Sequence, residues 1–70
     1  MEEKLPVGSK VLGIPLKELP IPATCVIAAV IRKSEVIVPR GDMIFQAGDE
    51  VLAVVNDQSR EVLKDLFTPG

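Results

Sequence analysis

The apolar residues of this chain form two runs typical of strands, close together near its middle. Residues 25–31 are apolar without interruption, and residues 36–38 form a second run after only four positions. Val and Ile dominate both runs, which favours strands near 25–32 and 35–38. Because a half-exposed strand alternates apolar and polar residues, the first run predicts a strand covered on both faces. A buried helix is the alternative that its pattern leaves open.

Short polar segments separate these runs from a third strand. Lys33-Ser34 is short enough for a tight hairpin turn, but neither residue is the Gly or Asn that such turns prefer, so a longer connection is the alternative. The sequence Gln46-Ala47-Gly48-Asp49 is typical of a turn. The apolar residues that follow it predict a strand near 50–55.

The last element is an amphipathic helix near 58–67. Its apolar residues recur at helical spacing and form one stripe, which predicts that the stripe packs in the core. Asn56 or Asp57 is placed to cap the first turn, whose backbone N–H groups lack partners inside the helix. The stripe consists of Val62, Leu63, Leu66 and Phe67.

The N-terminal third gives weaker signals. Residues 5–7 alternate and predict a short strand, which Pro6 confines to a sheet edge. Residues 13–19 predict a short helical turn with Pro15 in its first turn. Residues 43–45 are a short apolar piece that packs either inside the domain or against a partner. Together the elements predict one small α+β domain over residues 1–70.

Length and cysteine content bear on how such a small domain is stabilised. A chain of 70 residues buries only a modest core, and small domains commonly compensate with disulfides, metals or oligomerisation. Cys25 is the single cysteine and histidine is absent, which argues against an internal disulfide and a zinc site. We therefore expect a homodimer, formed at least partly through the apolar strands, with Cys25 as a buried core residue.

Charge and composition argue against several functional classes. The net charge of −2 does not favour nucleic acid, which is bound by clustered Lys and Arg. The apolar runs are too short to span a bilayer, and the acidic N-terminus is unlike a signal peptide, so we expect a cytoplasmic domain. No titratable group pairs with a nucleophile, and no phosphate-binding glycine motif is present. We expect no enzymatic activity, no cofactor and no metal.

Two arginines are the best candidates for contacting an anion. Arg32 and Arg40 lie at strand ends, and a guanidinium holds phosphate or carboxylate through two parallel hydrogen bonds. The alternative is that both are solvated charges. Asp42 and Asp49 follow Gly41 and Gly48, and we expect each Asp to accept backbone hydrogen bonds in its own turn and each Gly to adopt positive φ.

The motifs of this chain, and their order, resemble those of a known domain family. From residue 8 to residue 67 the chain resembles the TrkA C-terminal domain, also called the RCK C-terminal (RCK_C or TrkA-C) domain. The motifs that carry the resemblance are Leu12-Gly13, Leu16-Lys17-Glu18-Leu19, the strand ending Ile31-Arg32, Val36-Ile37-Val38-Pro39-Arg40-Gly41-Asp42 and Gln46-Ala47-Gly48-Asp49-Glu50-Val51-Leu52.

The resemblance implies a β-X-β-β-X-β-α module that dimerises. It implies a regulatory role in potassium transport systems, or in another ion transporter or antiporter. The implied partners are a Rossmann-like TrkA N-terminal domain, a membrane transporter subunit and a small regulatory ligand such as a nucleotide, bound at the dimer interface. The N-terminal half is not part of this sequence, which leaves a fragment and a stand-alone module as alternatives.

The resemblance also bears on which ligand is bound. Pro39 matches a family position that lines the ligand pocket, and the resemblance thus adds Pro39 to Arg32 and Arg40 as predicted ligand residues. Members that bind cyclic di-AMP tend to carry an Arg and an Asn before the central strand, whereas residues 19–28 here contain neither charge nor amide. The sequence therefore gives no support for cyclic di-AMP as the ligand. A plain oligomerisation domain and a small acidic adaptor are the alternative functions.

Overall fold

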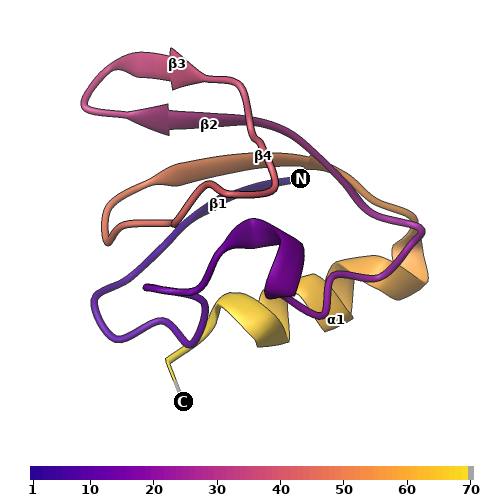
Figure 1. Cartoon of the computed structure of the whole chain (residues 1–70). Helices are drawn as coiled ribbons and strands as arrows, with labels where there is room; N and C mark the ends of the chain where they lie inside the picture. The colour runs from indigo at the N-terminus through magenta and orange to yellow at the C-terminus, as the bar shows by residue number, and fades with distance from the viewer. Residues whose placement is uncertain (70) are drawn as a thin grey trace.

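The computed structural model describes residues 1–69 and shows a four-stranded sheet with one helix packed against it (Figure 1). The strand pairings are antiparallel, and the order across the sheet is β1-β4-β2-β3. In chain order the elements are β1 (Glu2–Lys4), the 3-10 turn η1 (Leu16–Glu18), β2 (Val26–Arg32), β3 (Glu35–Ile37), β4 (Glu50–Val54) and α1 (Asp57–Phe67).

This order confirms the predicted α+β fold. The chain forms a strand, a connecting segment, two strands, a second connecting segment, a strand and a helix, in the order that the family resemblance implies. The three strands and the helix predicted from the pattern each lie within one residue of their expected bounds. The central apolar run is β2, so the alternative of a buried helix is wrong.

A two-residue turn joins β2 to β3. Arg32 pairs with Glu35 directly across the turn. Lys33 and Ser34 have φ values of 51° and 68°, and two successive positive φ values are typical of the type I′ turn, whose twist matches that of the flanking strands. The tight hairpin is therefore confirmed, and the longer connection is wrong.

The core lies between the sheet and α1, on what we call the inner face of the sheet. Leu63 and Phe67 point into it from α1, and Phe67 packs edge-on against Phe45 with ring centroids 6.0 Å apart. The Asn56 side chain accepts a hydrogen bond from the Ser59 N–H and caps the helix, as expected. The buried apolar residues are Leu5, Val11, Leu19, Cys25, Val30, Phe45, Val51, Ala53, Leu63 and Phe67.

Two details of the predicted core are corrected by the structure. Val62 belongs to the apolar stripe of α1 but is exposed, because an 11-residue helix on a small sheet buries only the centre of its stripe. Phe45 is buried within the chain, so the alternative that it faces a partner is wrong. Met43 is partly buried against the same core.

The first strand also differs from the prediction. β1 is formed by Glu2–Lys4 and pairs with β4, whereas the alternating residues 5–7 follow it outside regular structure. Pro6 has no N–H to donate, and Leu5 makes the last contacts of this edge: its N–H donates to the Asp49 carbonyl, and its own carbonyl accepts from the Gly48 N–H. The prediction of an N-terminal strand at the sheet edge is therefore confirmed, but the strand consists of Glu2–Lys4 and not of residues 5–7.

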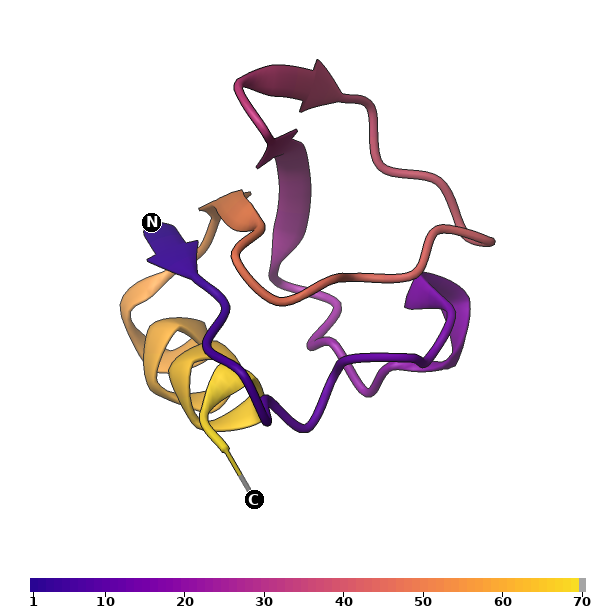
Figure 2. The same cartoon turned by 90° about the vertical axis from the view of Figure 1, so that its left-hand side faces the viewer.

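The opposite face of the sheet, the outer face, is bare. α1 and the long connecting segments all lie on the other side (Figure 2). Val26 and Ala28 in β2 are exposed, so this chain covers only one face of the strand that was predicted to be covered on both.

Candidate functional site

Arg32, the first predicted anion-contacting residue, is held in an ion pair on the inner side of the sheet. Its Nε donates to Asp49 Oδ1 at 2.9 Å, and its Nη2 donates to Asp49 Oδ2 at 2.8 Å. The same Nη2 donates to the Ile44 carbonyl at 3.0 Å. The Arg32 side chain is 23% exposed and that of Asp49 is 1% exposed. Arg32 thereby ties the end of β2 to the connecting segment 38–49.

The pKa values of the two groups reflect this geometry. Burial by itself raises the pKa of the Asp49 carboxyl, but the hydrogen bonds from Arg32 and from the Gln46 N–H, together with the charge of Arg32, bring the pKa below its ordinary value. The hydrogen bond to Asp49 raises the pKa of Arg32, and partial burial opposes that rise. The pair is therefore charged across the physiological pH range. The bond from Gln46 confirms that Asp49 accepts a backbone hydrogen bond in its own turn.

The segment that carries Pro39 and Arg40 is docked on η1. The Leu16 N–H donates to the Met43 carbonyl at 2.8 Å, and the Lys17 N–H donates to the Gly41 carbonyl at 2.9 Å. Gly41 does not have the predicted positive φ, and a Cβ placed on it would lie 3.4 Å from the Lys17 Cβ, which is close to ordinary van der Waals contact. Gly48 does have positive φ, at 90°.

The three predicted ligand residues therefore lie in different surroundings. Arg40 is exposed and Pro39 is partly buried, whereas the Nε and Nη2 atoms of Arg32 are engaged by Asp49 and Ile44. In the structure, Lys17 contacts Gly41, the residue that follows Arg40 in the sequence. This contact was not predicted. No signal in the sequence marks this contact, because it depends on how two irregular segments pair.

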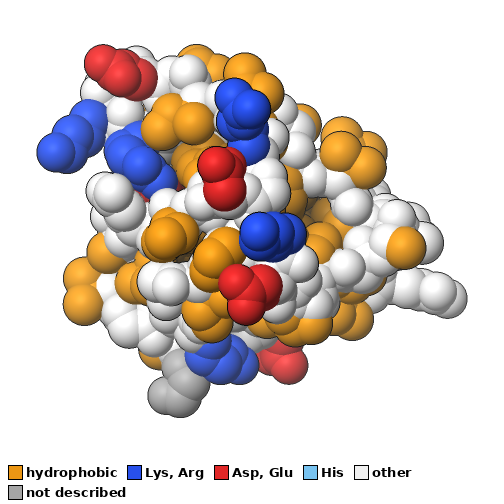
Figure 3. Space-filling model, in the orientation of Figure 1, with side chains coloured by type: hydrophobic (Ala, Val, Ile, Leu, Met, Phe, Trp, Pro, Cys, Tyr) orange, Lys and Arg blue, Asp and Glu red, His pale blue; other side chains and the backbone are white. Residues whose placement is uncertain are grey.

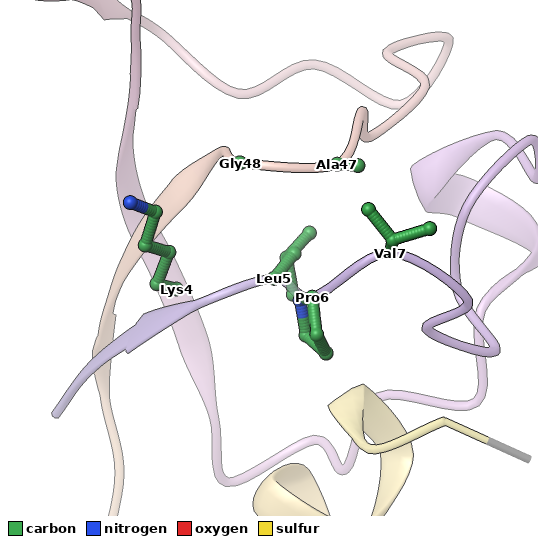
Figure 4. Close-up of a pocket in the computed structure, with 6 residues that line it drawn as sticks. All are labelled: Lys4, Leu5, Pro6, Val7, Ala47 and Gly48. Atoms are coloured by element: carbon green, nitrogen blue, oxygen red, sulfur yellow. The ribbon is translucent and has the colours of Figure 1, made fainter.

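A groove lies at the C-terminal end of β1. It has a volume of about 440 Å³ and is walled by the chain after β1 and by the turn before β4 (Figure 4). Val7 lies at one end and Lys4 at the other, with Ala47 and Gly48 across from them. The lining residues are Lys4, Leu5, Pro6, Val7, Ala47 and Gly48.

The thiol of Cys25 and the hydroxyl of Ser59 lie in packed surroundings. Cys25 is buried, and its Sγ lies 4.0 Å from the Ser59 carbonyl, while the Ser59 hydroxyl contacts that of Thr24. In residues 1–69, no cluster of three or more His, Cys, Asp or Glu side chains is placed to hold a metal ion. Within the same range, no helix has the length and apolar character to cross a bilayer.

The comparison with protein families agrees with this architecture. The family model described as the TrkA-C domain matches residues 1–68. The chain belongs to the TrkA-C domain family. The family is a regulatory one, and its RCK_C relatives share the antiparallel sheet and C-terminal helix found here.

Curated relatives of this TrkA-C domain are potassium uptake proteins. The chain is 39% identical over 62 residues to the Trk system potassium uptake protein TrkA homolog of Archaeoglobus fulgidus, covering 89% of this chain and 14% of that protein. It is 32% identical over 70 residues to TrkA of Mycobacterium tuberculosis, covering 100% of this chain and 32% of that protein. The chain thus spans a third or less of the length of these relatives.

Solved structures confirm the fold. An RCK domain solved with cda superposes with a TM-score of 0.84 at 25% identity, covering 97% of this chain and 96% of that one. The RCK_C domain dimer of S. agalactiae BusR in complex with c-di-AMP superposes with a TM-score of 0.82 at 23% identity, covering 96% of this chain and 92% of that one.

Proposed function

We propose that this TrkA-C domain is a regulatory module of a potassium or other cation transport system, acting in the cytoplasm as a ligand-binding homodimer. The observation that carries the proposal is the agreement of family and fold over nearly the whole chain, since residues 1–68 match the family model and 97% of the chain superposes on an RCK domain. The relatives that supply the transport function are TrkA proteins of potassium uptake.

The proposed partners follow from the length of the relatives. This chain covers 14% of the A. fulgidus protein and 32% of the M. tuberculosis protein, so these relatives contain further parts. We assign those parts to a Rossmann-like TrkA N-terminal domain or to a membrane transporter subunit. A ligand shifts such an assembly only if it binds one state more tightly than the other, and a site shared by two subunits changes whenever the subunits move.

The proposed ligand residues are Pro39, Arg40 and Arg32. Arg40 has its guanidinium exposed, which suits it to bind an anionic group, and Pro39 lies beside it on the connecting segment. Arg32 donates through Nε and Nη2 to protein atoms, which leaves Nη1 for a ligand. The chemistry that fits is a small molecule with a phosphate or carboxylate group.

Thermal melting of the chain with a panel of nucleotides, including cyclic di-AMP, ATP and cyclic di-GMP, tests the ligand proposal. A ligand present at about 100 times its Kd adds about 2.7 kcal/mol to the free energy of unfolding and raises the Tm accordingly. Arg40→Ala should weaken that shift, whereas Lys33→Ala, a matched change of another exposed basic residue, should leave it intact. A panel without any shift, or equal loss in both variants, would contradict the proposed site.

A plain dimerisation domain without a ligand is the second candidate. The observation that favours it is the combination of an occupied Arg32 and a segment, residues 19–28, with no charged or amide side chain. This candidate predicts a dimer whose Tm depends on protein concentration but on no nucleotide in the panel.

A further inference from the structure

The segment that carries Arg40 lies at the surface. It leaves β3, runs to η1 and returns to β4 (Figure 2). None of the described side chains of residues 38–44 is fully buried, and that of Ile44 is 45% exposed. The segment docks on η1, but η1 has no buried residue of its own. These contacts therefore join two surface segments, and other bonds must attach the segment to the sheet.

Arg32 provides this attachment. It is the last residue of β2, and its Nη2 donates to the Ile44 carbonyl at 3.0 Å. The buried side chain of Asp49 holds the same guanidinium through two further hydrogen bonds. Because the guanidinium is planar and its donors form a rigid fork, the three bonds fix the Ile44 carbonyl relative to β2. Phe45 is buried in the core, so the backbone that leads back to Arg40 is held at two adjacent residues.

A hydrogen-bonded turn carries this constraint from Ile44 to Arg40. The Met43 N–H donates to the Arg40 carbonyl at 3.0 Å, and Met43 directly precedes Ile44. A displacement of Ile44 is therefore passed on to Arg40 through one peptide unit and this turn. Binding a ligand costs the free energy of ordering the groups that hold it, and a backbone that is already fixed reduces this cost.

Arg32 differs from the basic residue beside it. Basic side chains gather over the end of the molecule that holds the turn from β2 to β3 (Figure 3). Lys33, in that turn, is exposed, whereas the Arg32 side chain is only 23% exposed. A ligand anion that displaced Asp49 from Arg32 would leave a buried carboxylate without its counter-charge, which is strongly unfavourable. We therefore expect the pair to persist when a ligand binds.

We infer that Arg32 and Asp49 are positioning residues of the proposed ligand site, which hold residues 40–44 in one conformation and so preorganise Arg40 for an anionic ligand. Positioning by this pair rests on the proposed function and deepens it, since that function gives Arg32 a direct contact through Nη1 and gives Asp49 no role. The pair acts through the segment, so neither residue needs to touch the ligand.

Amide hydrogen exchange tests whether Arg32 holds the segment. Arg32→Lys keeps a positive charge opposite Asp49 but lacks the fork that reaches Asp49 and Ile44 together, whereas Arg60→Lys makes the same change at an exposed position of α1. We expect the Met43 amide to exchange at least about tenfold faster in Arg32→Lys, and the amides between β2 and β4 to change less than about threefold. Arg60→Lys should change neither. Equal acceleration of all amides, or an unchanged Met43 amide, overturns the positioning role.

Binding of ATP separates positioning from direct contact. Isothermal titration measures the Kd of wild type, Arg40→Ala, Asp49→Asn and the double variant. Asp49→Asn leaves Arg32 its charge and its Nη1, so a direct contact survives, whereas lost positioning should raise the Kd about threefold to tenfold. Positioning through Arg40 also predicts that the double variant binds no more weakly than Arg40→Ala.

Two results of the titration contradict positioning, and a third concerns the proposed function. An unchanged Kd in Asp49→Asn, or losses in the two single variants that add up in the double variant, overturns the positioning role. A wild-type chain that does not bind ATP removes ATP from the proposed ligands, and the exchange of the Met43 amide then decides by itself whether Arg32 holds the segment.

Discussion

Arg32 and Asp49 are 17 positions apart in the chain, and two parallel hydrogen bonds of 2.9 and 2.8 Å join them. The carboxylate is almost completely buried, while the guanidinium retains some contact with solvent. The pair connects β2 to the start of β4, and its third bond, to the Ile44 carbonyl, holds the segment that buries Phe45. An arginine that the sequence presents as free to bind an anion thus holds a protein carboxylate.

Because Asp49 is more deeply buried than Arg32, replacing one residue of the pair should lower the free energy of unfolding by a different amount from replacing the other. Arg32→Met leaves a buried carboxylate without its counter-charge and should lower the free energy of unfolding by about 3 kcal/mol. Asp49→Asn leaves an arginine that can reach solvent, so its cost should be smaller. Urea denaturation of both variants and of the double variant measures this, with Arg40→Ala as an exposed control. A larger loss for Asp49→Asn than for Arg32→Met would contradict the argument.

Acid should destabilise the domain through Asp49. The pKa of its carboxyl lies below the ordinary value of 3.8 in the folded chain, so the unfolded chain binds the proton more readily. The stabilisation is present in full above that ordinary value and is lost as the pH falls through the folded pKa. Urea melts between about pH 5 and pH 2 should show a shallower decline for Asp49→Asn than for wild type. Parallel curves would show that other carboxyls dominate.

Two neighbouring residues of α1 should differ sharply in their contribution to stability. Leu63 is completely buried, and Leu63→Ala should cost about 2–5 kcal/mol, which in a domain this small threatens folding itself. Val62 is half-exposed on the same helix, and Val62→Ala should cost no more than about 0.5 kcal/mol. Denaturant melts of the two variants check the contrast, and similar losses would contradict the burial pattern.

The hairpin turn offers a way to stabilise the domain. Lys33 and Ser34 hold positive φ values that side chains other than Gly and Asn adopt at a cost. The double change Lys33→Asn and Ser34→Gly supplies residues that favour this conformation and should raise the free energy of unfolding by about 1 kcal/mol. Thermal melting tests the gain. Glu35→Gln, just outside the turn, should leave the Tm unchanged, and an unchanged Tm in the double variant would mean that the turn is not strained.

Local patterns were sufficient to predict most of the fold. Runs of β-branched residues marked β2, β3 and β4, and the helical stripe after Asn56 marked α1 and its cap, because each signal lies in adjacent residues. β1 was missed because its residues, Glu2–Lys4, are charged, and an edge strand needs no apolar face to pair with β4. The exposure of Val62 was missed because the stripe indicates a direction on the helix, not how far the sheet extends beneath it.

The α+β class and the order of the main elements follow from the periodicity and the turn residues of the chain, and its short motifs carried the resemblance to the family. The partner of Arg32 and the bare face of β2, in contrast, were revealed by the folded structure. Both depend on contacts between distant positions: Asp49 meets Arg32 through the pairing of β2 with β4, and a β-bulge at Ala28, where the register between these strands shifts, reverses which side chains point outward. A one-residue shift in register leaves the composition of a strand unchanged but exchanges its two faces, so only the folded pairing could show it.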